Sequence, residues 1–150
     1  MLRIPQQIID EIIHHANKGL PEEVCGYLAG YDGEVTNSIP MTNIDHSPEH
    51  FSFDPAEQFK VVREARNAGL EILANYHSHP ETPARPSVED IRLAYDPSIS
   101  YVIVSLAERV PVVKSFMIDK GKVENEIIEI TEFFQHYTPG SLIQKTIKNQ

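Results

Sequence analysis

A run of apolar residues from Tyr101 to Leu106 constrains the fold more than any other feature of the sequence. It reads YVIVSL, and a half-exposed strand would instead alternate polar and apolar side chains. A strand of this kind is buried on both faces, so helices must cover both sides of its sheet. Helical patterns are interleaved with strand-like segments along the chain. We therefore expect an α/β fold in which helices pack on a curved, mixed β-sheet.

Glycine, proline and capping residues predict where each element begins and ends. Apolar residues recur at helical spacing from Ile4 to Ala16, and Gly19-Leu20-Pro21 ends that pattern. Asp54-Pro55 followed by Glu57 is typical of a helix start, and Gly69 of its end. The predicted elements are helices over 4–16, 54–68 and 86–96, a hairpin of 24–30 with 34–41 turning at Asp32-Gly33, and strands over 70–77, 101–106, 110–118 and 123–130.

Length and composition limit the class of protein. With 150 residues, the chain is expected to form one domain over 1–130, with a helical extension over 131–150. The net charge of −9 argues against binding a phosphate backbone, so no nucleic-acid partner is expected. No apolar run approaches the roughly 18 residues of a membrane span, and the N-terminus does not resemble a signal peptide. The single cysteine, Cys25, fits a reducing compartment, so we expect a cytoplasmic protein.

His77, His79 and Asp90 are the residues that point to chemistry. Two histidines at i and i+2 near a strand end lie on the same face of the sheet, so both can bind one ion. A loop with Pro80, Pro83 and Pro86 then leads to Asp90, whose carboxylate could return to the same point. Imidazole and carboxylate are good zinc ligands, and three protein ligands leave a fourth position for water, as in catalytic sites. Zinc would bring the pKa of that water to about 7.

Each part of this pattern also has an ordinary structural explanation. A His-x-His pair alone is weak evidence for a metal site. Ser87-x-x-Asp90 also resembles a helix capping box with Asp in the usual Glu position. Because Asp90 could not ligate a metal and cap the helix with one lone pair, ligation is the interpretation we adopt. Cys25 is expected to be a buried, unreactive thiol, and the loop with His46 and His50 either borders a groove or is an ordinary surface loop.

The compound pattern resembles the signature of the JAMM, or MPN-plus, metallopeptidases. That signature joins a distant Glu to His-x-His-Pro, six residues and Ser-x-x-Asp, and here HSHP at 77–80 leads to SVED at 87–90. The segment PEEVCGYLAG at 21–30 supplies the distant carboxylate, and its Glu-x-x-Gly register selects Glu23 over Glu22. All five motif positions match, and the resemblance spans about residues 5–130. It implies a sheet and helices arranged as in the cytidine deaminases, but their Cys-x-x-Cys zinc signature is missing here.

The resemblance implies a role for each motif residue. His77, His79 and Asp90 would hold one zinc ion with water as the fourth ligand. Glu23 would take a proton from the attacking water and pass it to the leaving amine. Ser87 would hydrogen-bond the oxygen that becomes negative in the tetrahedral intermediate.

The same resemblance implies a hydrolase acting on peptide or isopeptide bonds. No long insertion flanks the motif, as in the compact prokaryotic members, which act at the Gly-Gly end of ubiquitin-like sulfur carriers, including removal of amino-acid adducts. We therefore expect a ubiquitin-like or sulfur-carrier partner whose extended tail lies in a groove and pairs with a strand edge. Two alternatives stay open: a small-molecule amide hydrolase using the same zinc site, and a non-catalytic binding module. Saturation by a short Gly-Gly amide would favour the first, and absence of stoichiometric metal the second.

Overall fold

The structure is a computed structural model, and it describes residues 1–132. Strands and helices alternate along most of this length. The elements, in chain order, are β1 (Leu2–Pro5), α1 (Gln6–Gly19), β2 (Cys25–Tyr31), β3 (Glu34–Met41), α2 (Pro55–Asn67), β4 (Glu71–His79), α3 (Val88–Arg92), β5 (Ser100–Ser105), β6 (Val112–Asp119), β7 (Lys122–Glu126) and β8 (Ile128–Thr131).

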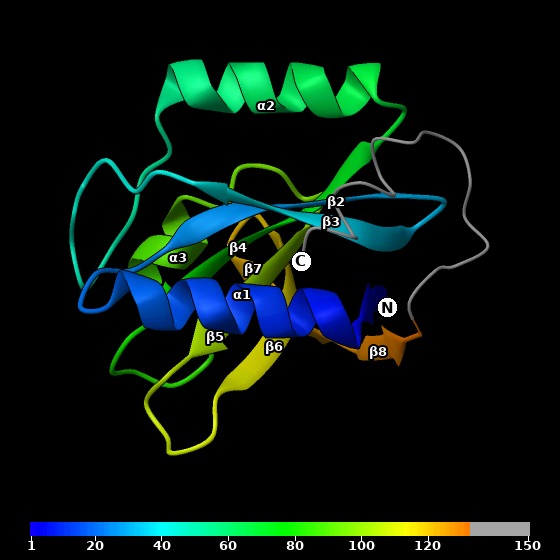
Figure 1. The fold of residues 1–150 in the computed structure, drawn as a ribbon. Coiled ribbons are helices and arrows are strands. Elements are labelled where there is room, and N and C mark those ends of the chain that lie inside the picture. The colour runs from blue at the N-terminus through cyan, green and yellow to red at the C-terminus, as the bar shows by residue number, and fades with distance from the viewer. Residues whose placement is uncertain (133–150) are drawn as a thin grey trace.

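One curved sheet contains all eight strands, in the order β7-β6-β5-β4-β2-β3-β1-β8. The central strand β4 pairs antiparallel with β2 and parallel with β5, so the sheet is mixed, as predicted. Helices α1 and α2 lie on opposite sides of the sheet (Figure 1). Strand β5 is buried along its whole length because one of its faces packs in the core beneath α1 and the other in a cluster that includes Ile91 of α3.

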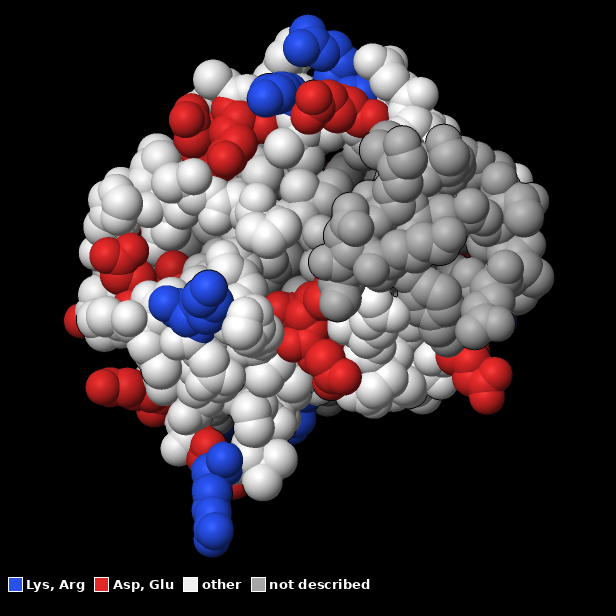
Figure 2. Space-filling view, in the orientation of Figure 1, with Lys and Arg blue, Asp and Glu red and all other residues white. Residues whose placement is uncertain are grey.

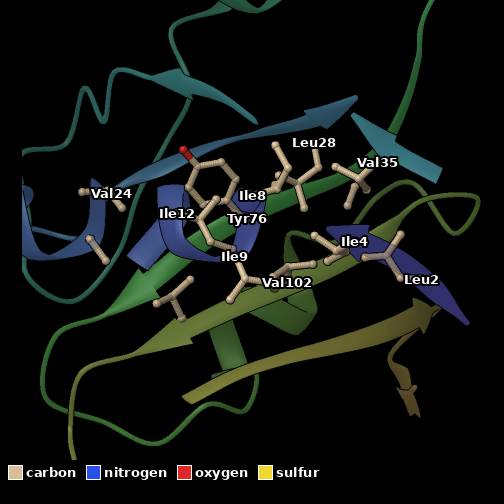
Figure 3. Packing of buried hydrophobic residues seen from close by; sticks show 13 residues of the cluster. Leu2, Ile4, Ile8, Ile9, Ile12, Val24, Leu28, Val35, Tyr76 and Val102 are labelled. Carbon is tan, nitrogen blue, oxygen red and sulfur yellow. The ribbon is translucent and has the colours of Figure 1, made fainter. Parts of the chain in front are cut away.

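The main core lies between α1 and the sheet. The apolar face of α1 carries Ile8, Ile9 and Ile12, which the helical period places on one side. These residues pack against sheet residues that include Tyr76 and Val102, as Figure 3 shows. Tyr76 is fully buried and joins this core together with Ala74, whereas Ile72, beyond a register shift in the pairing with β2, packs on the opposite face.

Among residues 1–132, two separate helices pack on the opposite face of the sheet. Helix α2 packs over Cys25, Tyr27 and neighbouring residues through Val61 and Val62. It begins where predicted, because the Asp54 side chain accepts a hydrogen bond from the Ala56 N–H at 3.0 Å. Short α3 packs through Ile91 on a separate cluster formed by β5 and β6. Asn75 and His77 of β4 lie between these two regions.

Three predicted elements differ from those observed. The expected helix from Ile4 begins at Gln6, because Leu2–Pro5 pairs in parallel with β8 and β3 as strand β1. The third helix is only Val88–Arg92, and the single strand expected over 123–130 is two strands, β7 and β8, separated at Ile127. The helices expected after Glu132 lie outside the described residues. Among residues 1–132, no helix combines the length and apolar character needed to cross a membrane.

Candidate active site

His77 and His79 project from the end of β4 on the face opposite the main core. Between them, Ser78 points the other way, and its Oγ accepts a hydrogen bond of 2.8 Å from the Val24 N–H. The Ser78 N–H donates to the Val24 carbonyl at 3.0 Å, so the end of β4 is tied to the residue that precedes β2. The strand alternation predicted from His-Ser-His is therefore the one observed.

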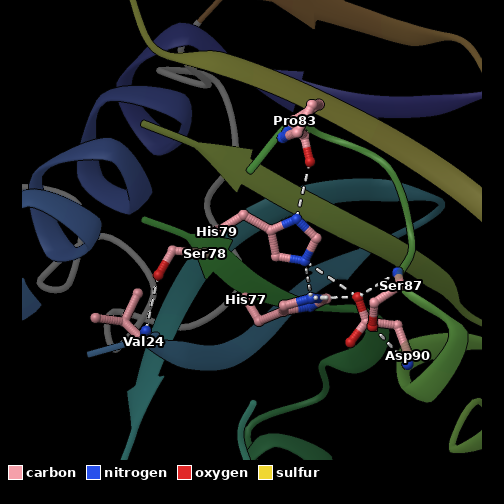
Figure 4. Close-up of polar contacts among 7 residues, drawn as sticks. All are labelled: Val24, His77, Ser78, His79, Pro83, Ser87 and Asp90. Carbon is pink, nitrogen blue, oxygen red and sulfur yellow. Dashed lines mark hydrogen bonds and ion pairs between the residues drawn. The ribbon is translucent and has the colours of Figure 1, made fainter. Parts of the chain in front are cut away.

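The three predicted metal ligands converge (Figure 4). Asp90 Oδ2 lies 3.1 Å from His77 Nε2 and 3.1 Å from His79 Nε2, and the two Nε2 atoms are 3.1 Å apart. Both histidines are buried. Two imidazole nitrogens and one carboxylate oxygen thus enclose a single point, although Asp90 is eleven residues beyond His79.

The loop between His79 and Ser87 is held at several places, which explains how it delivers Asp90. The His79 Nδ1 atom lies 2.9 Å from the Pro83 carbonyl oxygen. Ser105 Oγ, at the end of β5, donates to the Thr82 carbonyl at 2.6 Å. Ala84 is buried in the cluster beneath α3. The loop therefore has a fixed path along the end of the sheet.

Ser87 and Asp90 form a capping box at the start of α3. Ser87 Oγ accepts from the Asp90 N–H at 3.0 Å, and Asp90 Oδ2 accepts from the Ser87 N–H at 2.9 Å. The capping interpretation is therefore confirmed, and the cap still leaves Asp90 Oδ2 facing the two imidazoles. One carboxylate oxygen has more than one lone pair, and Oδ2 faces both the Ser87 N–H and the two imidazoles. The cap fixes the orientation of the carboxylate toward the histidines.

The donor set fits a zinc ion. A carbonyl oxygen accepts only, so the contact to Pro83 requires the hydrogen on His79 Nδ1 and leaves a lone pair on Nε2. The ligand atoms of His77, His79 and Asp90 all lie within 4.8 Å of one another. Two neutral imidazoles and a carboxylate are ligands that zinc accepts, and this number leaves a coordination position open.

Electrostatics also favour a cation at this point. Burial alone would raise the pKa of Asp90, but hydrogen bonds from His77 and His79 and the charge of His77 hold it well below its usual range. Burial lowers the pKa of His79, yet the contacts with Asp90 and Pro83 outweigh it and raise the pKa overall. Asp90 is thus an anion at neutral pH, and a metal would compete with a proton for His79 Nε2.

Glu23 is the buried carboxyl group beside this cluster. The antiparallel register pairs Cys25 with His77, and two residues further the same register sets Glu23 opposite His79. Only 4% of Glu23 is exposed, and its Oε1 has no hydrogen-bond partner among the described residues. Burial raises the pKa of Glu23 to about 8, and the charge of His79 opposes this rise. Glu22, the alternative carboxylate, lies outward and pairs with His46 at 3.3 Å.

A groove of about 730 Å³ extends from the metal ligands between α2 and α3. One row across three strands forms part of it: Tyr27 of β2, Asn75 of β4 and Tyr101 of β5 are register partners. Phe51, Ser52 and Phe53 also line it, so the loop after β3 does border a groove. Its volume is in the range of pockets that enclose ligands.

Two residues of the site region were not identified from sequence. Phe51 stacks on the ring of His77, with centroids 4.6 Å apart and an interplanar angle of 28°. Asn43 is a buried polar residue in the loop after β3. The Asn-x-Asp spacing of 43–45, which favours an Asx turn, was the one available signal for it.

Cys25 is fully buried on the same face as His77, and burial raises the pKa of its thiol to about 12, as expected for an unreactive cysteine.

The charged surface is mixed on the face that Figure 2 shows. Lys and Arg side chains gather with acidic ones over α2, and elsewhere among the described residues of that face they stand singly. Over the whole sequence, Asp and Glu outnumber Lys and Arg by 22 to 13.

Residues 5–119 match the model of a family described as prokaryotic homologs of the JAB domain. A curated relative, the CysO-cysteine peptidase of Mycobacterium tuberculosis, is 36% identical over 135 residues, which cover 88% of this chain and 92% of the relative. The desampylase of Haloferax volcanii is 36% identical over 103 residues, covering 64% of this chain and 74% of the relative.

Solved structures agree in fold. A solution structure of a Desulfitobacterium hafniense protein has a TM-score of 0.83 and 48% identity, and the match covers 91% of this chain and 97% of that one. A JAB1/MPN domain protein from Archaeoglobus fulgidus has a TM-score of 0.62 at 21% identity, covering 87% and 100% of the two chains. The mixed sheet with flanking helices is thus the JAB1/MPN fold, as predicted.

Proposed function

The chain belongs to the family of prokaryotic homologs of the JAB domain, and from this premise we propose that it is a zinc-dependent hydrolase of protein conjugates. Its substrate would be a peptide or isopeptide bond at the C-terminal Gly-Gly end of a ubiquitin-like or sulfur-carrier protein. The single observation that carries the proposal is a cluster of His77, His79 and Asp90 beside the buried carboxyl group of Glu23.

His77, His79 and Asp90 would hold the zinc ion. When bound, zinc supplies a Lewis acid and makes hydroxide available near neutral pH. Support comes from the lone pair that the Pro83 contact leaves on His79 Nε2 and from the Ser87 N–H that orients Asp90 Oδ2. Groups that orient the ligands in this way are as important as the ligands themselves.

Glu23 would be the general base and then the general acid. A carboxyl group with a pKa near neutrality can accept a proton from the attacking water and return it to the leaving amine, an effect typically worth 10²–10⁴-fold. Burial gives Glu23 that property, because it raises the pKa to about 8 in the absence of metal. Among the described residues its Oε1 has no hydrogen-bond partner, so one oxygen is available for this proton transfer.

Ser87 would stabilise the developing oxyanion. Its Oγ accepts the Asp90 N–H, so the hydroxyl hydrogen itself remains available to donate. Ser87 is exposed at the start of α3, next to the ligand cluster. A donor at such a position contributes about 10²–10³ in kcat.

The substrate class rests on the relatives and on the groove. The relatives' names describe cleavage of a CysO-cysteine conjugate and desampylation. A groove of about 730 Å³ beside the ligands has room for several residues of an extended tail. Glycines at the cleavage point would let the tail backbone approach the sheet closely.

A panel of carriers with extended C-termini tests the proposal. Zinc-loaded protein is mixed with ubiquitin-like carriers whose Gly-Gly end bears a single cysteine, a peptide or an isopeptide-linked lysine. The intact mass of each carrier is followed, with Glu23→Gln as the matched blank. We expect loss of one class of extension with the wild type alone. Cleavage of a short Gly-Gly amide with equal efficiency would instead favour a small-molecule amidase, and no cleavage by zinc-containing protein would contradict the proposal.

A further inference from the structure

We propose that Asn43 is a positioning residue that holds Glu23 and the aromatic wall of the groove in their catalytic arrangement. The inference rests on the proposed function, in which Glu23 is the general base. It concerns the loop of residues 42–53, which joins β3 to α2 and which we call the β3–α2 loop.

The Asn43 side chain uses all of its hydrogen-bonding capacity inside the protein. It is 7% exposed. Its Nδ2 donates to the Glu23 carbonyl at 3.0 Å and to the His50 carbonyl at 3.1 Å. Its Oδ1 accepts from the N–H of Asp45 at 3.0 Å and of Ser52 at 3.3 Å. An amide has two N–H donors and two acceptor lone pairs, so every one is satisfied.

These bonds fasten the backbone of Glu23 to the β3–α2 loop. Glu23 lies before β2 begins at Cys25, so the strand pairing of β2 does not hold its backbone. Its N–H donates to the Ser47 carbonyl at 2.8 Å, and its carbonyl accepts from Asn43. Both backbone groups of the proposed general base are therefore bound to one loop. Asn43 connects the Glu23 carbonyl to the later part of that loop, at His50 and Ser52.

The same side chain places Phe51 against a metal ligand. Asn43 binds the His50 carbonyl and the Ser52 N–H, which flank Phe51 on either side. Phe51 in turn stacks on His77, and both residues line the groove. Asn43 thus joins the general base, a ligand ring and the groove wall without touching the reacting atoms.

Removing these bonds should affect turnover more than metal binding or substrate binding. In Asn43→Ala all four bonds are lost, and Asn43→Asp keeps the acceptors but sets a carboxylate against two carbonyl oxygens. Misplacement of a reacting group by about 1 Å can lower the rate about 10²-fold. We expect kcat to fall by about 10–10²-fold in both variants, KM to change less than about 3-fold, and zinc to remain stoichiometric.

Asn37→Ala is the matched control. Asn37 is also a buried asparagine, 6% exposed, and it accepts a hydrogen bond of 2.7 Å from Thr36 Oγ1. It lies in β3 opposite Ala29, four residues along β2 from Cys25. We expect this variant to lose stability while kcat stays within about 2-fold of wild type. A kcat loss in Asn37→Ala equal to that in Asn43→Ala would assign both effects to stability and overturn the proposal.

Amide hydrogen exchange of the zinc-loaded protein, read residue by residue by NMR, gives a result that needs no turnover. In Asn43→Ala we expect the Glu23 and Ser52 amides to exchange about 10-fold faster or more, while the Val102 amide in β5 keeps its protection. Unchanged Glu23 exchange together with unchanged kcat would overturn the positioning role. If the wild type fails to cleave any carrier, the proposed function fails, and hydrogen exchange still decides whether Asn43 holds Glu23.

Discussion

Ionisation of Glu23 should lower the folding stability of the metal-free protein, and Glu23→Gln should abolish this loss of stability. The pKa of Glu23 rises on folding from 4.5 to about 8, chiefly because the carboxyl group is buried. Below pH 4.5 both the folded and the unfolded chain hold the proton. Between pH 4.5 and about 8 the unfolded chain releases it and the folded chain keeps it, so the free energy of unfolding falls as pH rises.

The size of this effect follows from the displacement of the pKa. Each pH unit over this interval changes the free energy of unfolding by about 1.4 kcal/mol, so the whole interval corresponds to about 4–5 kcal/mol. A glutamine at position 23 does not ionise, so this part of the pH dependence disappears. For a chain of this length the difference equals about 10 °C in Tm.

The wild type and Glu23→Gln, both treated with a chelator, are unfolded with urea at several pH values between about 5 and 8.5. This measures how the free energy of unfolding of each protein depends on pH. The difference between the two curves reports the ionisation of Glu23 together with its coupling to His79, and groups distant from both cancel. Glu23→Gln should gain on the wild type steadily with pH, by about 4 kcal/mol in total. A constant difference across this range would show that Glu23 ionises normally in the folded protein, and the argument for its role as a base near neutrality would be refuted.

Three further substitutions test separate parts of the account. His79→Ala leaves two protein ligands, so zinc bound after dialysis should drop well below one per chain by metal analysis; full zinc content would remove His79 from the ligand set. Ser87→Ala should lower kcat about 10²–10³-fold while the lost cap costs about 1 kcal/mol; a change in Tm alone would leave Ser87 only its capping role. Gly26→Ala should destabilise by about 3 kcal/mol in urea, because its Cβ would overlap the Tyr76 ring and the Ile39 carbonyl; wild-type stability would show that the sheet can shift there.

Most of the fold could be predicted from local signals. Asp54-Pro55, Gly69 and the Asp32-Gly33 turn mark real boundaries, and both turn residues have positive φ. Strand β1 was missed because Leu2–Pro5 is too short for its own period and owes its conformation to distant pairing with β8. The division of residues 122–131 into two strands has the same cause, since β7 pairs with β6 and β8 pairs with β1.

The shared face of His77 and His79 could be predicted from strand alternation, and the return of Asp90 to them was implied by the resemblance of the whole motif. The burial of Glu23 could not, because it depends on a register between β2 and β4 that no local pattern contains. Asn43 was overlooked for a related reason. A polar residue in a polar loop resembles a solvated one until the loop folds back and its side chain is buried against Glu23.

The central claim is that a metal held by His77, His79 and Asp90 and a base supplied by Glu23 act together in hydrolysis. The most direct test is to add zinc in small steps to the metal-free protein and follow release of the extension from a Gly-Gly carrier. Turnover should rise in proportion to zinc and stop rising at one ion per chain, while Glu23→Gln should bind the same ion and remain inactive. Undiminished turnover by the metal-free protein, or full activity of Glu23→Gln, would contradict the account.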